Sequence, residues 1–377
     1  MTVQLTVVED AGLDFRWPAD LLALQAEVQA VARAAGAGRP VLEDSWVTGF
    51  APEFSLELGR RGWLGMTFPI EEGGHGRSPL ERFVVTETLI AAGAPLAASW
   101  VGDRQIGPTL LANGSPAQRR TLLPGIISGR ESWCIGMSEP DAGSDLASLR
   151  TRATEGDGGW IVDGAKLWTS FAAEADWCYL IARTDPDAPA HLGLSEFAVA
   201  LSSPGISVRP VRDMTGAAHF CEVSFDGVRV PADHLIGQPH GSWKQLMRQL
   251  EHERGGADRL VSNRALFLAA IARADRDDPV VRQEIAALEG RYRVGRLLVV
   301  REALRQAPAG FSAATKVFCT EFEQRVAAFA GRCFGAETML AGRVSRAVCY
   351  SPAYTIQGGT SEILRTVVAE RILGLPR

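Results

Sequence analysis

Several signatures of nucleotide and metal chemistry are missing from this 377-residue sequence. It has neither the GxGxxG pattern of dinucleotide-binding folds nor the GxxxxGK[ST] pattern of phosphate-binding loops, and its glycine clusters at 73–76 and 156–159 fit neither spacing. It also lacks GxSxG and HExxH, and its six histidines form no cluster with cysteine or aspartate. A Rossmann domain, a P-loop, a metal site and a catalytic triad are therefore not expected.

Lysine is scarce. It occurs only at 166, 244 and 316, so nearly all the positive charge is arginine, a bias that we interpret first as genome composition. The 39 lysines and arginines face 44 aspartates and glutamates, which gives a formal charge of −5. This balance argues against binding to nucleic acid or anionic membranes through bulk charge. Small molecules or proteins are the expected partners.

Paired cysteines and long apolar runs are absent as well. The six cysteines are scattered without a CxxC pair, which favours a reducing cytoplasm. The start, MTVQLTVVEDAGLDF, lacks the basic and apolar parts of a targeting signal, and no run approaches the roughly 18 apolar residues that span a bilayer. We expect a cytoplasmic protein without membrane insertion.

The order of local patterns predicts an α+β fold in three parts. Apolar residues recur at helical spacing from about residue 17, and Ser78-Pro79-Leu80-Glu81 and Ser115-Pro116 are typical helix starts. Seven short runs rich in β-branched and aromatic residues follow, which predict an antiparallel β-sandwich or barrel, and then helical spacing resumes. The predicted domains are 1–130, 131–237 and 238–377.

One segment differs in kind from an ordinary loop. WCIGMSEPDAGSDLASL, residues 133–149, ends a predicted strand and then places Ser138 and Ser144 around a turn of proline, alanine and glycine. Small residues with exposed backbone N–H groups can approach a flat ring or a pyrophosphate closely. The alternative is a plain loop with an Asx-type turn at Asp145.

Five segments resemble, in order, the acyl-CoA dehydrogenase family. They are PIEEGGHG at 69–76, SEPDAGSD at 138–145, DGAKLWTS at 163–170, FDGVRVP at 225–231 and QGGTSEI at 357–363. The family's fold has the same helical–β–helical order and ends in a four-helix bundle. The resemblance implies FAD as the cofactor, which carries the hydride chemistry while the protein orients it.

The resemblance also implies roles for individual residues. The backbone of Met137 and the hydroxyl of Ser138 are expected at the flavin ring, with Trp168 packed on it and Ser170 near its N5 atom. Ser144 is expected at the pyrophosphate or the pantetheine arm. The alternative for Trp168 is an ordinary core aromatic. The remaining implied residues are Ile135, Gly143, Thr360 and Glu362 for the cofactor, and Ser144, Leu250 and Gly359 for the substrate.

The catalytic base is not where many family members carry it. Dehydrogenation of an acyl thioester requires a carboxylate in an apolar pocket to remove the Cα proton. Many members place this glutamate directly before the Gly-Thr of the C-terminal loop, where this chain has Gly358. Its backbone N–H, together with a flavin ribityl hydroxyl, can still donate to the thioester carbonyl.

A second variant, resembling isovaleryl- and long-chain-type dehydrogenases, has the base on a helix immediately before an arginine. Glu253-Arg254 occupies that position, and Leu246, Leu250 and Glu253 fall on one helical face. We therefore predict Glu253 as the base, braced by Arg254, whereas Glu251 has the setting of a solvated acid. The alternative for Glu253 is a buried ion pair with an arginine.

Two family segments are altered. The Arg-x-x-Phe-Gly that grips the FAD of a neighbouring subunit is replaced by ALFLAAIARADRDDP, and a later Gly-Gly-x-Gly becomes CFGAE at 333–337. Three readings stay open: an acyl-thioester dehydrogenase passing electrons to an electron-transfer flavoprotein, a flavin monooxygenase or oxidase, and a non-catalytic subunit. The substrate is an acyl-CoA or a carrier-protein thioester, and the assembly a homodimer, homotetramer or heterotetramer.

Overall fold

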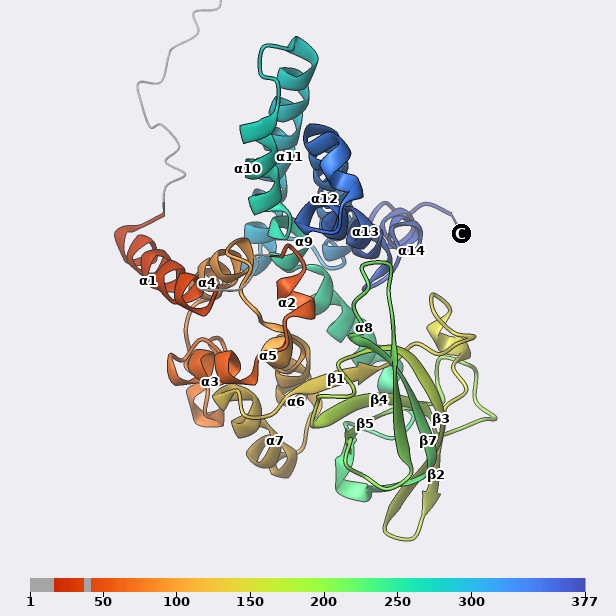
Figure 1. Cartoon of the computed structure of the whole chain (residues 1–377). Helices are drawn as coiled ribbons and strands as arrows, with labels where there is room; N and C mark the ends of the chain where they lie inside the picture. Colours follow the sequence, from red (N-terminus) through yellow and green to blue (C-terminus); the bar gives the residue numbers. More distant parts are fainter. Residues whose placement is uncertain (1–16, 37–41, 377) are drawn as a thin grey trace, which may run out of the picture.

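The computed structural model describes residues 17–36 and 42–376, without the side chains of residues 251–253. Its N-terminal part is helical (Figure 1). The elements are α1 (Ala19–Gly36), α2 (Ser45–Thr48), α3 (Pro52–Arg60), η1 (Ile70–Glu72), α4 (Pro79–Ala91), α5 (Ala97–Val101), the π-helical η2 (Gly102–Ile106), α6 (Gly107–Asn113) and α7 (Pro116–Ser128). Helices α4 and α7 begin with capping boxes at Ser78 and Ser115, which confirms both predicted helix starts.

The middle part is a single sheet that contains every predicted strand. The strands are β1 (Trp133–Gly136), β2 (Arg152–Gly156), β3 (Gly159–Ser170), β4 (Trp177–Arg183), β5 (Leu194–Ala200), β6 (Ile206–Val211), β7 (Phe220–Pro231) and β8 (Leu235–Ile236), with 3₁₀ turns η3 (Leu146–Ser148) and η4 (Ala232–His234). Their order is β6-β7-β3-β2-β4-β5-β8, and β1 pairs with β4.

The pairing differs in one respect from the predicted antiparallel arrangement. Strands β1 and β4 run parallel, with Trp133 opposite Trp177, and β2 touches β4 in parallel at Arg152. A parallel pair requires a long connection, and alternation within one strand carries no information about the direction of its neighbour. Strand β8 has only two residues, too few to produce a sequence pattern.

The C-terminal part is helical again, and the α+β class is confirmed. Its elements are α8 (Ser242–Arg254), α9 (Asp258–Val261), α10 (Arg264–Arg273), α11 (Pro279–Ala303), α12 (Ser312–Phe334), η5 (Gly335–Met339), α13 (Arg343–Ile356), α14 (Ser361–Val367) and η6 (Val368–Ile372). In Figure 1, α8 lies between the sheet and the remaining C-terminal helices. Helix α8 contacts β5, η2 and α12, and so touches all three parts of the chain.

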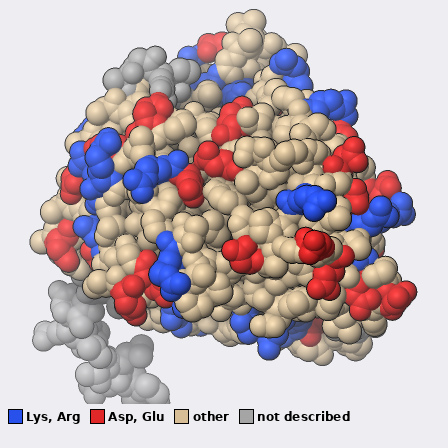
Figure 2. Space-filling model, turned by 90° about the horizontal axis from the view of Figure 1, so that it is seen from below, with Lys and Arg blue, Asp and Glu red and all other residues tan. Residues whose placement is uncertain are grey.

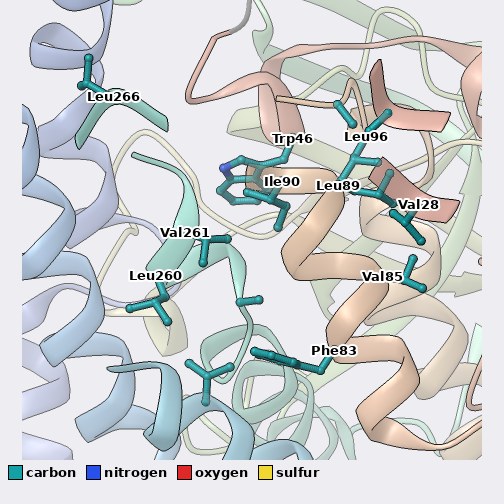
Figure 3. Packing of buried hydrophobic residues seen from close by; sticks show 14 of the residues in the cluster. Val28, Trp46, Phe83, Val85, Leu89, Ile90, Leu96, Leu260, Val261 and Leu266 are labelled. Carbon is teal, nitrogen blue, oxygen red and sulfur yellow. The ribbon is translucent and has the colours of Figure 1, made fainter. Parts of the chain in front are cut away.

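Two apolar cores hold the parts together. One joins N-terminal and C-terminal helices, where Trp46 and Phe83 pack near Val261 (Figure 3), and Trp46 Nε1 donates a hydrogen bond to Ser262 Oγ over 2.9 Å. The other places Leu246 of α8 against the sheet face that carries Tyr179. Buried apolar area is the main source of stability. The second core packs α8 against the sheet and against the N-terminal residues Ile106 and Leu110.

The surface in Figure 2 carries positive and negative side chains interspersed, without a broad field of one sign. This agrees with the nearly balanced composition. Among the helices that the structure describes, none has both the length and the apolar character to cross a membrane.

Candidate functional site

A buried ion pair joins the first two motifs of the sequence. Lys166 of β3 is 0% exposed, and its Nζ donates hydrogen bonds to Met137 O at 3.0 Å and to Glu139 Oε1 at 2.8 Å. The backbone of Leu167 donates to Ser138 O at 2.9 Å. The strand that carries Trp168 and the loop that carries Ser138 are thus held together at atomic contact.

Glu139 also closes its own loop. Its carboxylate accepts hydrogen bonds from the backbone N–H groups of Arg150 at 2.6 Å and Thr151 at 2.8 Å. Burial lowers the pKa of Lys166 to about 8, although Glu139 opposes this effect. Burial acts to raise the pKa of Glu139, but the charge of Lys166 and these hydrogen bonds outweigh it and leave that pKa below its usual value. The pair stabilises residues 137–151 as one rigid loop.

Trp168 is displayed rather than packed in the core. It is 53% exposed, and its φ of 63° is in the left-handed region that non-glycine residues seldom adopt. It falls within the bulge between Lys166 and Thr169 where β3 pairs with β7, and its ring meets the ring of Phe220 edge to face at 5.5 Å. Backbone strain of this kind persists only where the surroundings enforce it. The core-aromatic alternative does not fit this exposed ring.

The remaining predicted residues of this region are exposed or half-buried. Gly143 and Ser144 are exposed, and a Cβ built on Gly143 meets no atom within 4 Å. Ile135, Ser138 and Ser170 are half-buried. Exposed small residues and an exposed indole are features that suit contact with a flat, polar-edged ligand.

The C-terminal loop is held by two cations from different helices. Nε of Arg254, at the end of α8, donates to Gly358 O at 3.1 Å, and Nζ of the buried Lys316 of α12 donates to Gly359 O at 2.8 Å. Both glycines have positive φ, 66° and 95°. A Cβ at Gly359 would lie 3.4 Å from Arg254 Nη2, so the loop approaches that arginine closely. The structure thus brings Arg254 to the loop that contains Gly358.

The predicted base lies on α8, one residue before Arg254. The last turn of this helix includes position 253, but the side chains of Glu251 and Glu253 lie outside the described residues. Upstream on the same helix, Leu246 is fully buried and Leu250 is half-buried against the sheet cluster. Helical periodicity puts position 253 on the face of these leucines.

Thr360 and Glu362 are placed at the start of α14. Thr360 is the N-cap, and its Oγ1 accepts a hydrogen bond from the Ile363 backbone at 3.2 Å. Its hydroxyl hydrogen is still available to a ligand. Glu362 is exposed and lines a surface hollow of about 530 Å³ together with Arg365.

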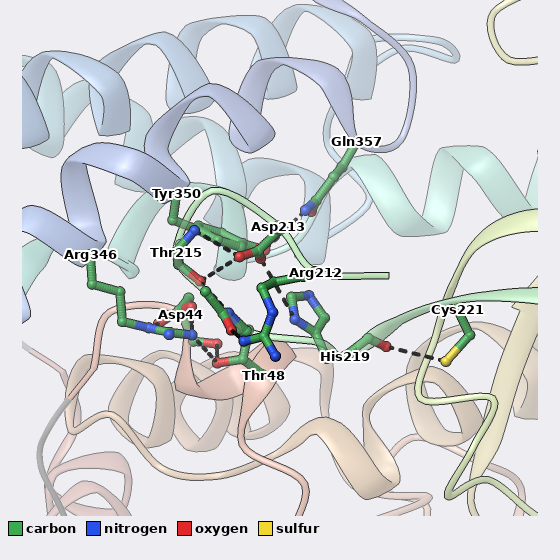
Figure 4. Close-up of polar contacts among 12 residues, drawn as sticks. Asp44, Thr48, Arg212, Asp213, Thr215, His219, Cys221, Arg346, Tyr350 and Gln357 are labelled. Carbon is green, nitrogen blue, oxygen red and sulfur yellow. Dashed lines mark hydrogen bonds and ion pairs between the residues drawn. The ribbon is translucent and has the colours of Figure 1, made fainter. Parts of the chain in front are cut away.

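The β6–β7 hairpin lies between the end of strand β3 and the C-terminal loop. His219 O accepts from the Phe171 backbone at 2.7 Å, and the His219 ring lies 4.0 Å from that of Phe220. Figure 4 shows His219 and Asp213 beside Tyr350 and the side chain of Gln357, whose Nε2 donates to Tyr350 Oη at 2.9 Å. Since Phe171 follows β3 and Gln357 directly precedes Gly358, the hairpin links the end of β3 with the C-terminal loop.

Three family models match successive parts of the chain between residues 18 and 373. They describe the acyl-CoA dehydrogenase N-terminal domain over residues 18–130, the middle domain over 134–228 and the C-terminal domain over 241–373. The chain belongs to the acyl-CoA dehydrogenase family. The resemblance and the fold are thereby confirmed, as is the class of enzyme, and the family implies a flavin cofactor.

Individual relatives agree with the family models. Acyl-CoA dehydrogenase IpdE1 of Mycobacterium tuberculosis is 36% identical over 339 residues, 86% of this chain and 88% of that protein. The structure entitled Tcur3481-Tcur3483 steroid ACAD superposes with a TM-score of 0.86 at 32% identity, covering 97% of this chain and all of that one. The ChsE4-ChsE5 complex from Mycobacterium tuberculosis gives 0.84 at 29%, with coverages of 97% and 100%.

Three contact residues were missed from the sequence, namely Glu139, Lys166 and Lys316. A signal for two of them existed. In a chain that uses arginine almost everywhere, Lys166 and Lys316 are two of only three lysines, and both are completely buried. By contrast, the described part of the chain contains no group of three potential metal ligands, and all six cysteines are free thiols.

Proposed function

We propose that this chain is an FAD-dependent acyl-thioester dehydrogenase. Its substrate is an acyl-CoA or a carrier-protein acyl thioester, and its product is the trans-2-enoyl thioester. The observation that carries this proposal is the hydrogen bond from Arg254 to Gly358 O. It joins the end of α8, the helix that includes position 253, to the loop that has a glycine at position 358. We infer from this that the Glu253 carboxylate and the loop N–H act in one site.

The open region around Trp168 fits FAD. The exposed indole offers a flat face to the isoalloxazine, and we assign the backbone of Ile135 and Met137 and the hydroxyls of Ser138 and Ser170 to the same cofactor. Gly143 and Ser144 leave room for the pyrophosphate or the pantetheine arm, and Thr360 and Glu362 border the C-terminal side. When bound, FAD supplies the acceptor for the hydride from the substrate Cβ.

Residues of the chain itself remove the substrate Cα proton and bind the thioester carbonyl. A carboxylate oxygen of Glu253 takes the Cα proton, as general-base catalysis requires. The Gly358 N–H donates to the thioester carbonyl, which stabilises the negative charge that develops there. Leu250 and Gly359 contact the substrate, and Arg254 keeps the base and the loop in register.

The assembly and the electron acceptor are part of the same proposal. We infer an oligomer, either a homodimer or homotetramer or a heterotetramer, and an electron-transfer flavoprotein as acceptor. The altered Arg-x-x-Phe-Gly segment supports a partner subunit of different sequence, in which case cross-subunit FAD contacts come from that partner. The six free cysteines support a cytoplasmic location.

Anaerobic bleaching of the flavin tests the reaction. The purified protein, with any partner subunit, is titrated with straight-chain, branched and steroid-type acyl-CoA thioesters, and the visible flavin band is followed. We expect bleaching with at least one thioester, and Glu253→Gln should abolish it while the yellow cofactor stays bound. Glu251→Gln, two residues away on the same helix, is the matched control and should bleach normally.

Three results would contradict the proposal. Near-wild-type turnover of Glu253→Gln with an artificial electron acceptor would show that the base lies elsewhere. Rapid oxygen consumption with little reaction toward an electron-transfer flavoprotein would indicate an oxidase or monooxygenase. Failure of the complete assembly to bind any flavin would indicate a non-catalytic subunit.

A further inference from the structure

Arg104 is an interior arginine on an irregular helical turn. It belongs to the π-helical segment η2, which interrupts the run of helix from α5 to α6. Its neighbours Asp103 and Gln105 are buried, and its own side chain is 16% exposed. π-Helical turns widen a helix locally and occur often at functional sites. The guanidinium therefore lies deep in the molecule while part of it faces accessible space.

The contacts of Arg104 leave its donors largely unused. The guanidinium lies over the Trp100 ring at 4.8 Å, and its Nη2 is 3.6 Å from Asp258 Oδ1, too far for a hydrogen bond. It makes no hydrogen bond to any residue that the structure describes. The second oxygen of Asp258 is 3.1 Å from Arg259 Nε, so this carboxylate is shared between two arginines. A guanidinium has five N–H donors, so those of Arg104 that face accessible space can bind an acceptor.

The position of Arg104 relates it to the proposed site. A Cβ built on Gly256 would lie 2.5 Å from Arg104 Nη2, so the chain just beyond α8 approaches this guanidinium closely. Gly256 is two residues beyond Arg254, which holds the Gly358 carbonyl. Gln105, the next residue of η2, accepts a hydrogen bond at its Oε1 from Gln249 Nε2 of α8, at 3.3 Å. The turn that carries Arg104 is thus packed along the helix that carries the proposed base.

We propose that Arg104 binds an oxygen acceptor on the acyl group and so selects acyl thioesters that carry a carboxylate or a ketone carbonyl beyond Cβ. This inference rests on the proposed function, because it places the acyl group along the end of α8. A guanidinium can bind a carboxylate with two parallel hydrogen bonds and a carbonyl with one or two. An unsubstituted hydrocarbon chain would leave the donors of Arg104 without acceptors.

Matched thioesters test this selection. Three CoA thioesters of equal chain length, one unsubstituted, one with a terminal carboxylate and one with a ketone, are compared by kcat/KM in anaerobic bleaching and by calorimetric titration of the holoenzyme. We expect the wild type to favour at least one oxygenated thioester about tenfold or more over the plain one, the size expected for a hydrogen bond to a charged group. Comparing the two oxygenated thioesters shows whether Arg104 prefers a carboxylate or a ketone carbonyl.

Variants then assign the preference to Arg104. Arg104→Met should reduce the ratio of oxygenated to plain kcat/KM towards one, and Arg104→Lys should keep part of the preference. Arg82→Met is the matched control, since Arg82 also pairs with a carboxylate in this region, Asp103 at 3.0 Å, and should leave the ratio unchanged.

The outcomes separate this inference from the proposed function. A wild type without preference, or an Arg104→Met variant that affects all three thioesters equally, would show that Arg104 only stabilises the fold through Asp258. If no thioester bleaches the flavin, the proposed function is wrong. In that case the calorimetric preference and its loss in Arg104→Met still decide whether Arg104 binds an oxygenated ligand.

Discussion

Replacing Lys316 by methionine removes a single buried charge from the support of the C-terminal loop. The Lys316 Nζ lies 2.8 Å from Gly359 O, and the side chain is 0% exposed. A hydrogen bond to a charged group contributes about 1.5–3 kcal/mol. Methionine fills similar space without a donor, so the Gly359 carbonyl loses this partner in the interior.

The effect on catalysis follows from where that carbonyl stands. Gly359 is adjacent to Gly358, the proposed oxyanion donor, and Arg254 holds the other carbonyl of the pair. If the hydrogen bond from Lys316 positions the loop for the transition state, its loss removes about 1.5–3 kcal/mol of transition-state stabilisation. Since 1.4 kcal/mol corresponds to a factor of ten, kcat should fall by roughly 10- to 100-fold. Thermal unfolding will also occur at a lower temperature.

The assay separates positioning from stability. Rates of anaerobic flavin bleaching give kcat and KM for Lys316→Met, and the flavin spectrum reports whether cofactor binding is intact. Lys244→Met is the control, because Lys244 is exposed on α8 and should change neither parameter. Wild-type kcat in Lys316→Met, with only a lower unfolding temperature, would refute a positioning role.

Three further substitutions follow from the geometry. Trp168→Gly should weaken flavin binding without loss of stability, because glycine adopts a φ of 63° freely; unchanged cofactor affinity would be inconsistent with stacking. Burial raises the pKa of Glu196 from its ordinary 4.5 to about 8, so the folded chain binds more protons than the unfolded chain between these values. This contribution to stability is present below about pH 4.5 and lost towards pH 8, and Glu196→Gln should flatten that slope in denaturant titrations. Gly359→Ala, at a φ of 95°, should cost about 1–3 kcal/mol of stability and slow bleaching, whereas Gly290→Ala in α11, where a Cβ meets nothing, should be neutral or stabilising.

The sequence was sufficient to predict the fold because its signals are local. Helical spacing, seven strand-like runs and two serine-led helix starts each depend on residues within a few positions of one another. The parallel pairing of β1 with β4 could not be predicted in this way, because it joins residues 44 positions apart, such as Trp133 and Trp177. The exposure of Trp168 could likewise not be predicted from the periodicity of the sequence, because it depends on a bulge in the pairing of β3 with β7.

The contacts that organise the site were less visible, because they link residues from separate elements. Glu139 and Lys166 occur in two motifs that the resemblance already singled out, yet their ion pair spans 27 positions. Lys316 belongs to no motif and reaches a loop 43 positions away. The hydrogen bond from Arg254 to Gly358 O spans 104 positions, and the sequence predicted only that Arg254 braces the base, which stays a prediction.

The scarcity of lysine offers a physical criterion for such residues. Lys166 donates to one backbone carbonyl and one carboxylate oxygen, and Lys316 donates to the carbonyl of Gly359. A compact ammonium with three donors suits such a pocket, whereas a guanidinium would bring a larger plane and five donors into the same space. Where composition favours arginine throughout, a buried lysine therefore indicates an interior position at which arginine does not fit. Lys166→Arg and Lys316→Arg should accordingly unfold at lower temperature than the wild type, and the exposed Lys244→Arg should not.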